Sequence, residues 1–147
     1  AYMLNLGLES LHVRMARHCE NGQAVAEFLA SHPKIAYVNY CGLPGDKYHA
    51  VAEKYLPSGS CGVVSCGGRG GGIAAAAFMG HLKIAAIETH VADARTCCLH
   101  PASSTHRQMN DEQLIAAGVQ PDLVRMSCGL EDKNDLIHDI ALALDQI

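Results

Sequence analysis

Leu123-Val124-Arg125-Met126-Ser127-Cys128 is the stretch of sequence from which the fold can be built outward, and Gly129-Leu130-Glu131 follows it at once. Its apolar residues predict a strand, and Arg125 places a cation inside that strand. Burying an unpaired guanidinium is costly, whereas its planar fork of donors suits a carboxylate or phosphate bound in bidentate fashion. We interpret the missing partner of Arg125 as the carboxylate of a substrate.

Strands and helices alternate along the rest of the chain. Glycine- and proline-containing turns separate short apolar runs from stretches with helical spacing or alanine-rich composition. Further strands are expected at residues 35–40, 61–66, 82–87 and 95–99, and helices at residues 48–55, 73–79, 111–117 and 132–147. This order predicts an α/β (α+β) fold in which a small sheet is covered by helices on one face.

The N-terminal segment predicts one long amphipathic helix over residues 1–32. Its apolar residues recur three to four positions apart, or at multiples of that spacing: Leu4, Leu8, Leu11, Met15, Cys19, Val25, Phe28 and Leu29. Pro33 should end the helix, because proline cannot continue the hydrogen-bond ladder and disfavours helix in the residue before it. The 147 residues suit a single domain. Since Ala1 leads directly into helical pattern, we expect a piece of a longer polypeptide.

Composition argues against several classes of protein. The chain is 49% hydrophobic and 18% charged, with a formal net charge of -4, so nucleic acid is not an expected partner. No apolar stretch approaches the ~20 residues that span a bilayer and no signal peptide pattern is present, so we expect a cytoplasmic protein without a membrane partner. The 7 cysteines are odd in number and form no C-x-x-C pair, which predicts reduced, mostly buried thiols.

Three other site chemistries have weaker support. The glycine-rich segment 68–72 precedes a helix but matches no phosphate-binding motif, so a plain turn is favoured. His100 and His106 have no recognisable metal-ligand spacing, so we expect no metal and interpret both as holding a loop through hydrogen bonds to the backbone. No nucleophile elbow occurs, and adjacent Cys97 and Cys98 in a strand would point to opposite faces.

Four motifs, in order, resemble one enzyme family. They are Gly7-Leu8-Glu9-Ser10-Leu11-His12-Val13-Arg14-Met15, Asn39-Tyr40-Cys41-Gly42-Leu43-Pro44, His100-Pro101-Ala102-Ser103-Ser104-Thr105-His106 and Gly118-Val119-Gln120-Pro121-Asp122-Leu123-Val124-Arg125-Met126-Ser127-Cys128-Gly129-Leu130-Glu131. From about Leu4 to its end, the chain resembles the C-terminal part of the Cys/Met-metabolism enzymes that use pyridoxal phosphate. Within that family the resemblance is greatest to the O-acetylhomoserine sulfhydrylases.

The resemblance implies both a fold and a role for Arg125. The fold would be the small C-terminal domain of the fold-type I, aspartate aminotransferase-like architecture, an antiparallel sheet covered by helices. Its long first helix, within residues 1–32, would lead to a large domain that binds pyridoxal phosphate. The arginine of the motif R-x-S-x-G-x-E binds the substrate α-carboxylate in this family, which places that role on Arg125. Ser127 and Glu131 of the same motif are expected to support the strand end without being catalytic.

His90 is a second candidate substrate-binding residue. The family places a serine or asparagine ten residues before the histidine of H-P-A, close to the bound carboxylate, and this count leads from His100 to His90. The usual Asn-Val-Gly-Asp sequence becomes His90-Val91-Ala92-Asp93 here, with a bulkier, titratable group at the site. The alternative is that His90 only occupies a loop near the cleft.

The resemblance covers only the smaller domain, so a large domain is implied as partner. The Schiff-base lysine, the aspartate at the pyridine nitrogen and the phosphate-binding loop would lie there. None of the 5 lysines present fits the first role: Lys34, Lys47, Lys54, Lys83 and Lys133. The chain alone should therefore bind no cofactor and catalyse nothing.

The implied reaction of the whole, tetrameric enzyme converts O-acetyl-L-homoserine and sulfide to L-homocysteine and acetate. A cystathionine γ-synthase or γ-lyase type of activity and a stand-alone non-catalytic domain are the alternatives.

Overall fold

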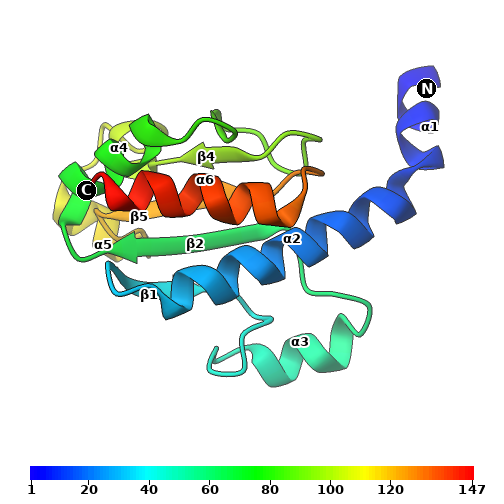
Figure 1. Cartoon of the computed structure of the whole chain (residues 1–147), viewed down its shortest axis with the longest axis horizontal. Helices are drawn as coiled ribbons and strands as arrows, with labels where there is room; N and C mark the ends of the chain where they lie inside the picture. The colour runs from blue at the N-terminus through cyan, green and yellow to red at the C-terminus, as the bar shows by residue number, and fades with distance from the viewer.

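The strand that carries Arg125 lies at the centre of a five-stranded sheet in the computed structural model, which describes residues 1–147. The strand order is β1-β2-β5-β4-β3, and Figure 1 labels the first four of these strands. The strands are β1 (Ile35–Asn39), β2 (Val63–Gly68), β3 (Ala86–Ile87), β4 (Cys97–Leu99) and β5 (Leu123–Ser127). The expected fold class is confirmed.

Pairing in the sheet is antiparallel except at one edge. β5 pairs antiparallel with both β2 and β4, so Arg125 lies opposite Ser65 on one side and Leu99 on the other. β3 and β4 run parallel. A parallel pair needs a connection that returns the chain to the starting end, and because β3 has only two residues, the loop over residues 88–96 suffices. This loop becomes central to the site described below.

The chain has six α-helices, three of which cover one face of the sheet. They are α1 (Tyr2–Glu9), α2 (Leu11–Ser31), α3 (His49–Tyr55), α4 (Gly71–His81), α5 (Asp111–Ala116) and α6 (Lys133–Asp145), with a 3-10 turn at Pro101–Ser103. The helices α2, α4 and α6 pack on the sheet, and α6 contacts both of the others (Figure 1).

The core lies between these helices and the sheet. Val124 and Met126 of β5 are 3% and 0% exposed and belong to the core cluster, together with Leu29 of α2 and Ile140 of α6. Side chains alternate along a strand. Arg125 therefore points to the opposite face of the sheet, away from α2 and α6.

The long first helix is broken at Ser10, where the sequence predicted continuity. The backbone of Ser10 leaves helical geometry at φ -107 and ψ 5, and α1 has no buried residue to hold its direction. The Arg14 side chain stabilises the break by donating to Ser10 Oγ at 3.3 Å and to the main-chain oxygen of Gly7. The predicted end of the helix is confirmed, since α2 stops at Ser31.

The segment expected as a strand at residues 82–87 forms a strand only at its last two residues. Asp139 of α6, which is 6% exposed, accepts hydrogen bonds from the backbone nitrogens of Lys83 at 2.9 and 3.2 Å and of Ile84 at 2.9 Å. Those nitrogens are therefore not available to a neighbouring strand. No helix in the structure combines the length and the apolar character that crossing a bilayer requires.

Candidate functional site

Arg125 is a partly buried cation without an ionic partner. Its Nη2 donates to the main-chain oxygens of Thr89 at 2.8 Å and His90 at 3.4 Å. Its Nε is buried and has no hydrogen-bond partner. No carboxylate of the chain forms an ion pair with it. Nη1 forms no hydrogen bond within the chain, so the guanidinium has unused capacity to bind an anion.

The loop over residues 88–96 that provides those two carbonyls is fastened to the end of β5. The Ser127 hydroxyl accepts a hydrogen bond from the Ala92 nitrogen at 3.0 Å. The Glu131 carboxylate accepts two from Thr96, one from its nitrogen at 2.6 Å and one from its hydroxyl at 2.8 Å. The sequence-based expectation that Ser127 and Glu131 have a supporting role agrees with these contacts.

Helix α2 fixes the chain that follows Arg125. Buried His18 meets the Cys128 carbonyl through Nδ1 at 2.6 Å. Buried Asn21 donates from Nδ2 to the main-chain oxygens of Gly129 at 2.9 Å and Glu131 at 2.8 Å. These polar contacts cross the core between helix and strand, so α2 sets the position of the arginine-bearing strand. The sequence argument missed His18 and Asn21, because each looks like an ordinary member of a helix.

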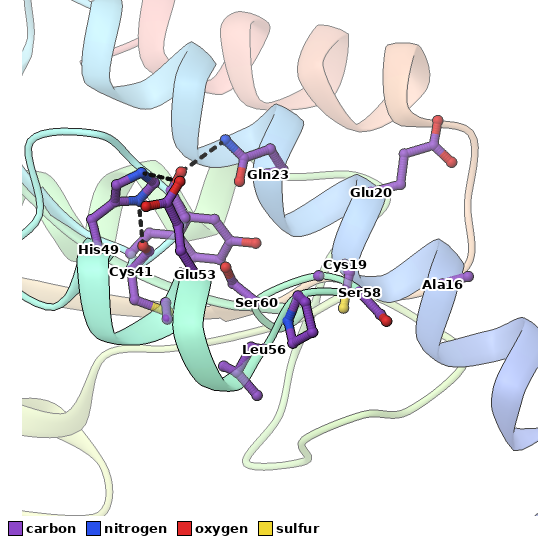
Figure 2. A pocket seen from close by; sticks show the side chains of 15 residues that line it. Ala16, Cys19, Glu20, Gln23, Cys41, His49, Glu53, Leu56, Ser58 and Ser60 are labelled. Atoms are coloured by element: carbon purple, nitrogen blue, oxygen red, sulfur yellow. Dashed lines mark hydrogen bonds and ion pairs between the residues drawn. The ribbon is translucent and has the colours of Figure 1, made fainter.

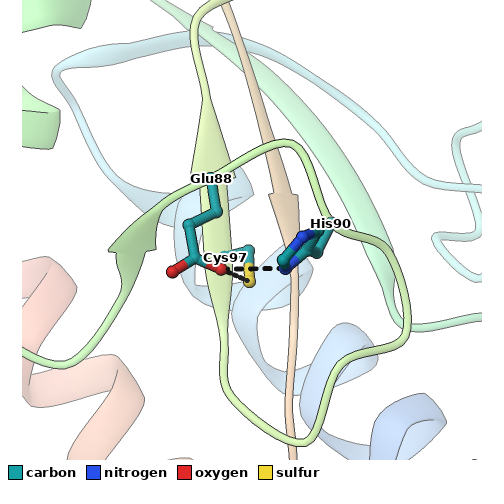
Figure 3. A group of neighbouring side chains, drawn as sticks. All are labelled: Glu88, His90 and Cys97. Atoms are coloured by element: carbon teal, nitrogen blue, oxygen red, sulfur yellow. Dashed lines mark hydrogen bonds and ion pairs between the residues drawn. The ribbon is translucent and has the colours of Figure 1, made fainter.

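His90 lies beside Arg125 through its backbone and points its ring elsewhere. Its imidazole Nδ1 is 2.9 Å from the Glu88 carboxylate and 3.7 Å from that of Asp93, and the side chain is 62% exposed (Figure 3). The sequence therefore located His90 correctly in the loop at Arg125. The structure assigns its imidazole to acidic neighbours and only its carbonyl to the arginine.

Glu88 and Cys97 join His90 in a cluster that spacing in the sequence did not suggest. The ligand atoms of all three side chains lie within 4.8 Å of one another. Cys97 and Cys98 point to opposite faces as expected, since Cys98 belongs to the core cluster and Cys97 meets Glu88 at 3.8 Å. No spacing rule finds this group, because it depends on the parallel register of β3 and β4.

The other histidines singled out in the sequence behave differently from each other. His100 has Nε2 2.8 Å from the Pro121 carbonyl and Nδ1 2.9 Å from the Ser103 hydroxyl, which confirms its loop-holding role. His106 was expected to do the same, and that was wrong: its ring contacts only the hydroxyl of Thr105, at 2.9 Å. In the glycine-rich turn, Arg69 donates from Nε to the Pro33 carbonyl at 3.0 Å.

A cavity of about 590 Å³ lies apart from Arg125, between α2, α3 and the segment before β2 (Figure 2). Its polar walls include His49, which contacts the Cys41 carbonyl at 3.0 Å and the Glu53 carboxylate at 3.6 Å. Arg125 and His90 do not line this cavity. The two candidate residues from the sequence therefore share a different place, the open side of the sheet.

Most of the thiols lie in the interior, as the sequence predicted. All seven cysteines are free and four are buried. Burial raises the pKa of Cys98 to about 11 and that of Cys66 and Cys128 to about 12. Thiols that stay protonated are poor nucleophiles. These three therefore act as packing groups.

Comparison with known proteins connects this arrangement to a family. The model of the family described as Cys/Met metabolism PLP-dependent enzyme matches residues 1–145. The chain belongs to this family. Residues 1–145 include Arg125, the loop that holds it and the helix that positions its strand, so the whole arrangement described above lies inside the family match.

The relatives share about a third of their length with this chain. A homocysteine synthase of Schizosaccharomyces pombe is 42% identical over 98% of the chain and 34% of its own length. An O-acetyl-L-homoserine sulfhydrylase of Leptospira meyeri is 42% identical over 100% of the chain and 34% of its own length. An L-methionine gamma-lyase of Fusobacterium nucleatum is 37% identical over 100% of the chain and 37% of its own length.

A solved structure supports the fold assignment. The crystal structure of a proposed O-acetylhomoserine (thiol)-lyase from Campylobacter jejuni, which contains N'-pyridoxyl-lysine-5'-monophosphate, has a TM-score of 0.89 at 35% identity. The match covers 95% of this chain and 33% of that one. This similarity shows that the sheet and helices described above share the fold of about a third of that chain.

The five lysines of the chain lie on its surface or contact groups other than Arg125. Lys34 donates to the main-chain oxygens of Leu144 and Ile147, and Lys133 pairs with Glu20 at 2.8 Å. Lys47 and Lys54 lie over tyrosine rings, and Lys83 is exposed. None of them contacts Arg125. What the chain offers is a cation for an anionic partner.

Proposed function

We propose that this chain is the part of a PLP-dependent O-acetylhomoserine sulfhydrylase that binds the substrate α-carboxylate through Arg125. The observation that carries the proposal is the free donor capacity of that arginine: Nη2 is fixed by Thr89 and His90, Nε is buried without a partner, and no carboxylate neutralises the charge. An amino acid carboxylate would supply the negative charge and would accept from Nη1, which forms no hydrogen bond within the chain.

Arg125 would act by positioning. A carboxylate held by the planar fork has a fixed direction, and this orients the rest of a bound amino acid, which can contribute several kcal/mol to a reaction. The backbone carbonyls of Thr89 and His90 hold the fork in place. Pyridoxal phosphate, bound by the remainder of the enzyme, supplies the electron sink for the reaction. A direct contact between the His90 ring and the substrate stays a prediction.

The exposed apolar surface of the first two helices supports a further domain as partner. Tyr2, Met3, Leu4, Leu6, Leu8 and Val13 are all more than half exposed. Contiguous exposed apolar side chains of this kind mark interaction surfaces. We infer that this surface packs against the N-terminal, cofactor-binding domain of the parent protein. A tetramer and a cytoplasmic location belong to the same proposal, as does the lack of activity in the chain alone.

The test is substitution of Arg125 in the full-length parent. Arg125→Ala should raise the KM for O-acetylhomoserine at least about tenfold, because the α-carboxylate loses a charge-assisted bidentate partner. Arg69→Ala removes an exposed arginine on the far side of β2 and is the matched control, with an expected KM close to that of the wild type. An unchanged KM in Arg125→Ala would refute the assignment.

A γ-lyase activity is the second candidate, since L-methionine gamma-lyases are 34% to 37% identical to the chain. Identities of 41% to 42% to sulfhydrylases favour the first. Sulfide-dependent formation of homocysteine from O-acetylhomoserine would indicate the sulfhydrylase, whereas elimination on methionine would indicate the γ-lyase. The third alternative is a non-catalytic module, and it is tested by the visible absorbance of the purified chain mixed with pyridoxal phosphate. An absorption band of protein-bound cofactor would contradict our expectation that this chain lacks the Schiff-base lysine.

A further inference from the structure

Three side chains of different chemistry meet beside the loop that holds Arg125. Glu88 follows β3, His90 lies two residues later, and Cys97 begins β4 (Figure 3). Glu88 Oε2 is 2.9 Å from His90 Nδ1 and 3.8 Å from Cys97 Sγ. The three ligand atoms all lie within 4.8 Å of one another. The parallel pairing of β3 and β4 brings them together.

A fourth donor lies at the same histidine. Asp93 Oδ2 is 3.7 Å from His90 Nδ1. The Asp93 side chain also accepts a hydrogen bond from the Arg95 nitrogen at 3.0 Å, which fixes its carboxylate near the start of β4. Asp93 is not among the residues whose ligand atoms all lie within 4.8 Å of one another, so the cluster itself offers one nitrogen, one sulfur and one carboxylate oxygen.

We propose that Glu88, His90 and Cys97 form a binding site for a divalent transition-metal ion of the Zn²⁺ type, with water as the fourth ligand. A tetrahedral Zn²⁺ site has metal-to-ligand distances of roughly 2.0 to 2.3 Å, so its ligand atoms lie ~3.3 to 3.7 Å apart. The separations of 2.9 Å between the Glu88 and His90 ligand atoms and 3.8 Å between those of Glu88 and Cys97 are close to that requirement. Mixed imidazole, thiolate and carboxylate ligands select Zn²⁺ over Mg²⁺ or Ca²⁺, which prefer oxygen alone.

Binding would release one proton. The Cys97 thiol loses its proton to solvent as the sulfur–metal bond forms, and the neutral imidazole of His90, with its ring proton moved from Nδ1 to Nε2, donates its Nδ1 lone pair. One carboxylate and one thiolate then place two negative charges around the dication. These two charges balance those of the ion, and the ion would join the loop whose carbonyls hold the Arg125 guanidinium to β4, next to the arginine.

Cobalt is the probe for this site, because Co²⁺ takes the geometry of Zn²⁺ and reports thiolate ligation by its charge-transfer absorption. Reduced, metal-free chain is titrated with Co²⁺ and then with Zn²⁺. We expect a thiolate-to-cobalt band that saturates at one equivalent and disappears on addition of Zn²⁺. Absence of the band in the wild-type chain would overturn the proposal.

Variants assign the ligands. Cys97→Ala should abolish the band, and Glu88→Gln and His90→Asn should each weaken Zn²⁺ binding at least about tenfold, measured by competition with a chromophoric chelator. The control is Cys41→Ala, which removes a partly buried thiol outside the cluster and should leave the band unchanged. Glu88→Gln and His90→Asn alter exposed side chains, and circular dichroism of each variant verifies folding. A band that survives in Cys97→Ala, or undiminished affinity in both other variants, would refute the site. The proposal does not depend on the proposed function, since no assay here uses substrate or pyridoxal phosphate.

Discussion

The Nη2 atom of Arg125 donates a hydrogen bond to the main-chain oxygen of Thr89 at 2.8 Å. This bond joins the central strand of the sheet to the loop between β3 and β4, and it uses a backbone acceptor that carries no charge. The guanidinium is thereby oriented without being neutralised. A carboxylate in place of that carbonyl would have satisfied the arginine within the chain and left nothing for a ligand.

Arg125→Lys tests whether orientation matters beyond charge. Lysine keeps the cation but has no planar fork, so it cannot donate to Thr89 and also bind a carboxylate in bidentate fashion. In the full-length parent we expect the KM for the amino acid substrate to lie between that of the wild type and that of Arg125→Ala. Steady-state kinetics of the three proteins provide the measurement. A KM equal to that of the wild type would mean that charge alone suffices.

Ala92→Gly should stabilise the protein by about 0.5 to 1 kcal/mol. Ala92 has a φ of 59°, the only positive value at a residue other than glycine. A side chain costs ~1 to 2 kcal/mol in that conformation, which exceeds the entropy that glycine adds to the unfolded chain. Ala94→Gly, in the same loop without positive φ, is the control and should destabilise by ~0.5 to 1 kcal/mol. Urea unfolding of both variants gives the free energies, and the same sign for both would contradict the argument.

Asp139→Ala should destabilise the fold by about 2 to 3 kcal/mol. The buried carboxylate is the acceptor for the nitrogens of Lys83 and Ile84, and hydrogen bonds to charged groups contribute ~1.5 to 3 kcal/mol. The control is Asp135→Ala, an exposed change in the first turn of the same helix, with an expected loss below about 1 kcal/mol. Urea denaturation measures the difference. Equal losses of free energy of unfolding in the two variants would show that Asp139 contributes only as an acidic residue of the helix and not through its hydrogen bonds to Lys83 and Ile84.

Local pattern was enough to predict the elements that depend on local chemistry. Pro33 marks the end of α2, and the alternation around Arg125 marks β5, because both signals come from neighbouring residues. Segment 82–85 failed as a strand, since its nitrogens bind a carboxylate more than fifty residues later in the sequence. No local rule contains that interaction.

The same reasoning applies to the candidate site. The sequence named Arg125 and His90, and the structure brings them together through a backbone carbonyl at 3.4 Å. It could not give the direction of the His90 ring, which depends on Glu88 and Asp93. Nor could it find Cys97 beside them, because that proximity follows from strand register and not from spacing along the chain.

Stability should fall in alkali through the buried thiols. The pKa of Cys98 is raised by burial from 9.0 to about 11, and burial raises those of Cys66 and Cys128 to about 12. The unfolded chain thus loses these protons first. The contribution of the protonated thiols to the free energy of unfolding is complete below about pH 9. It is lost as the pH rises towards 11 for Cys98 and 12 for the other two, at ~1.4 kcal/mol per pH unit for each thiol.

Urea unfolding under reducing conditions at pH 8, 9, 10 and 10.5 measures this decline. Cys98→Ala removes one of the three thiols, so its stability should start lower at pH 8 and decline less steeply above pH 9 than that of the wild type. The comparison of slopes, not of absolute stabilities, isolates the proton linkage from the lost packing. A wild-type free energy of unfolding that stays constant between pH 8 and 10.5 would contradict this prediction. It would mean that these thiols have the same pKa in the folded and unfolded chain, so that burial does not raise it.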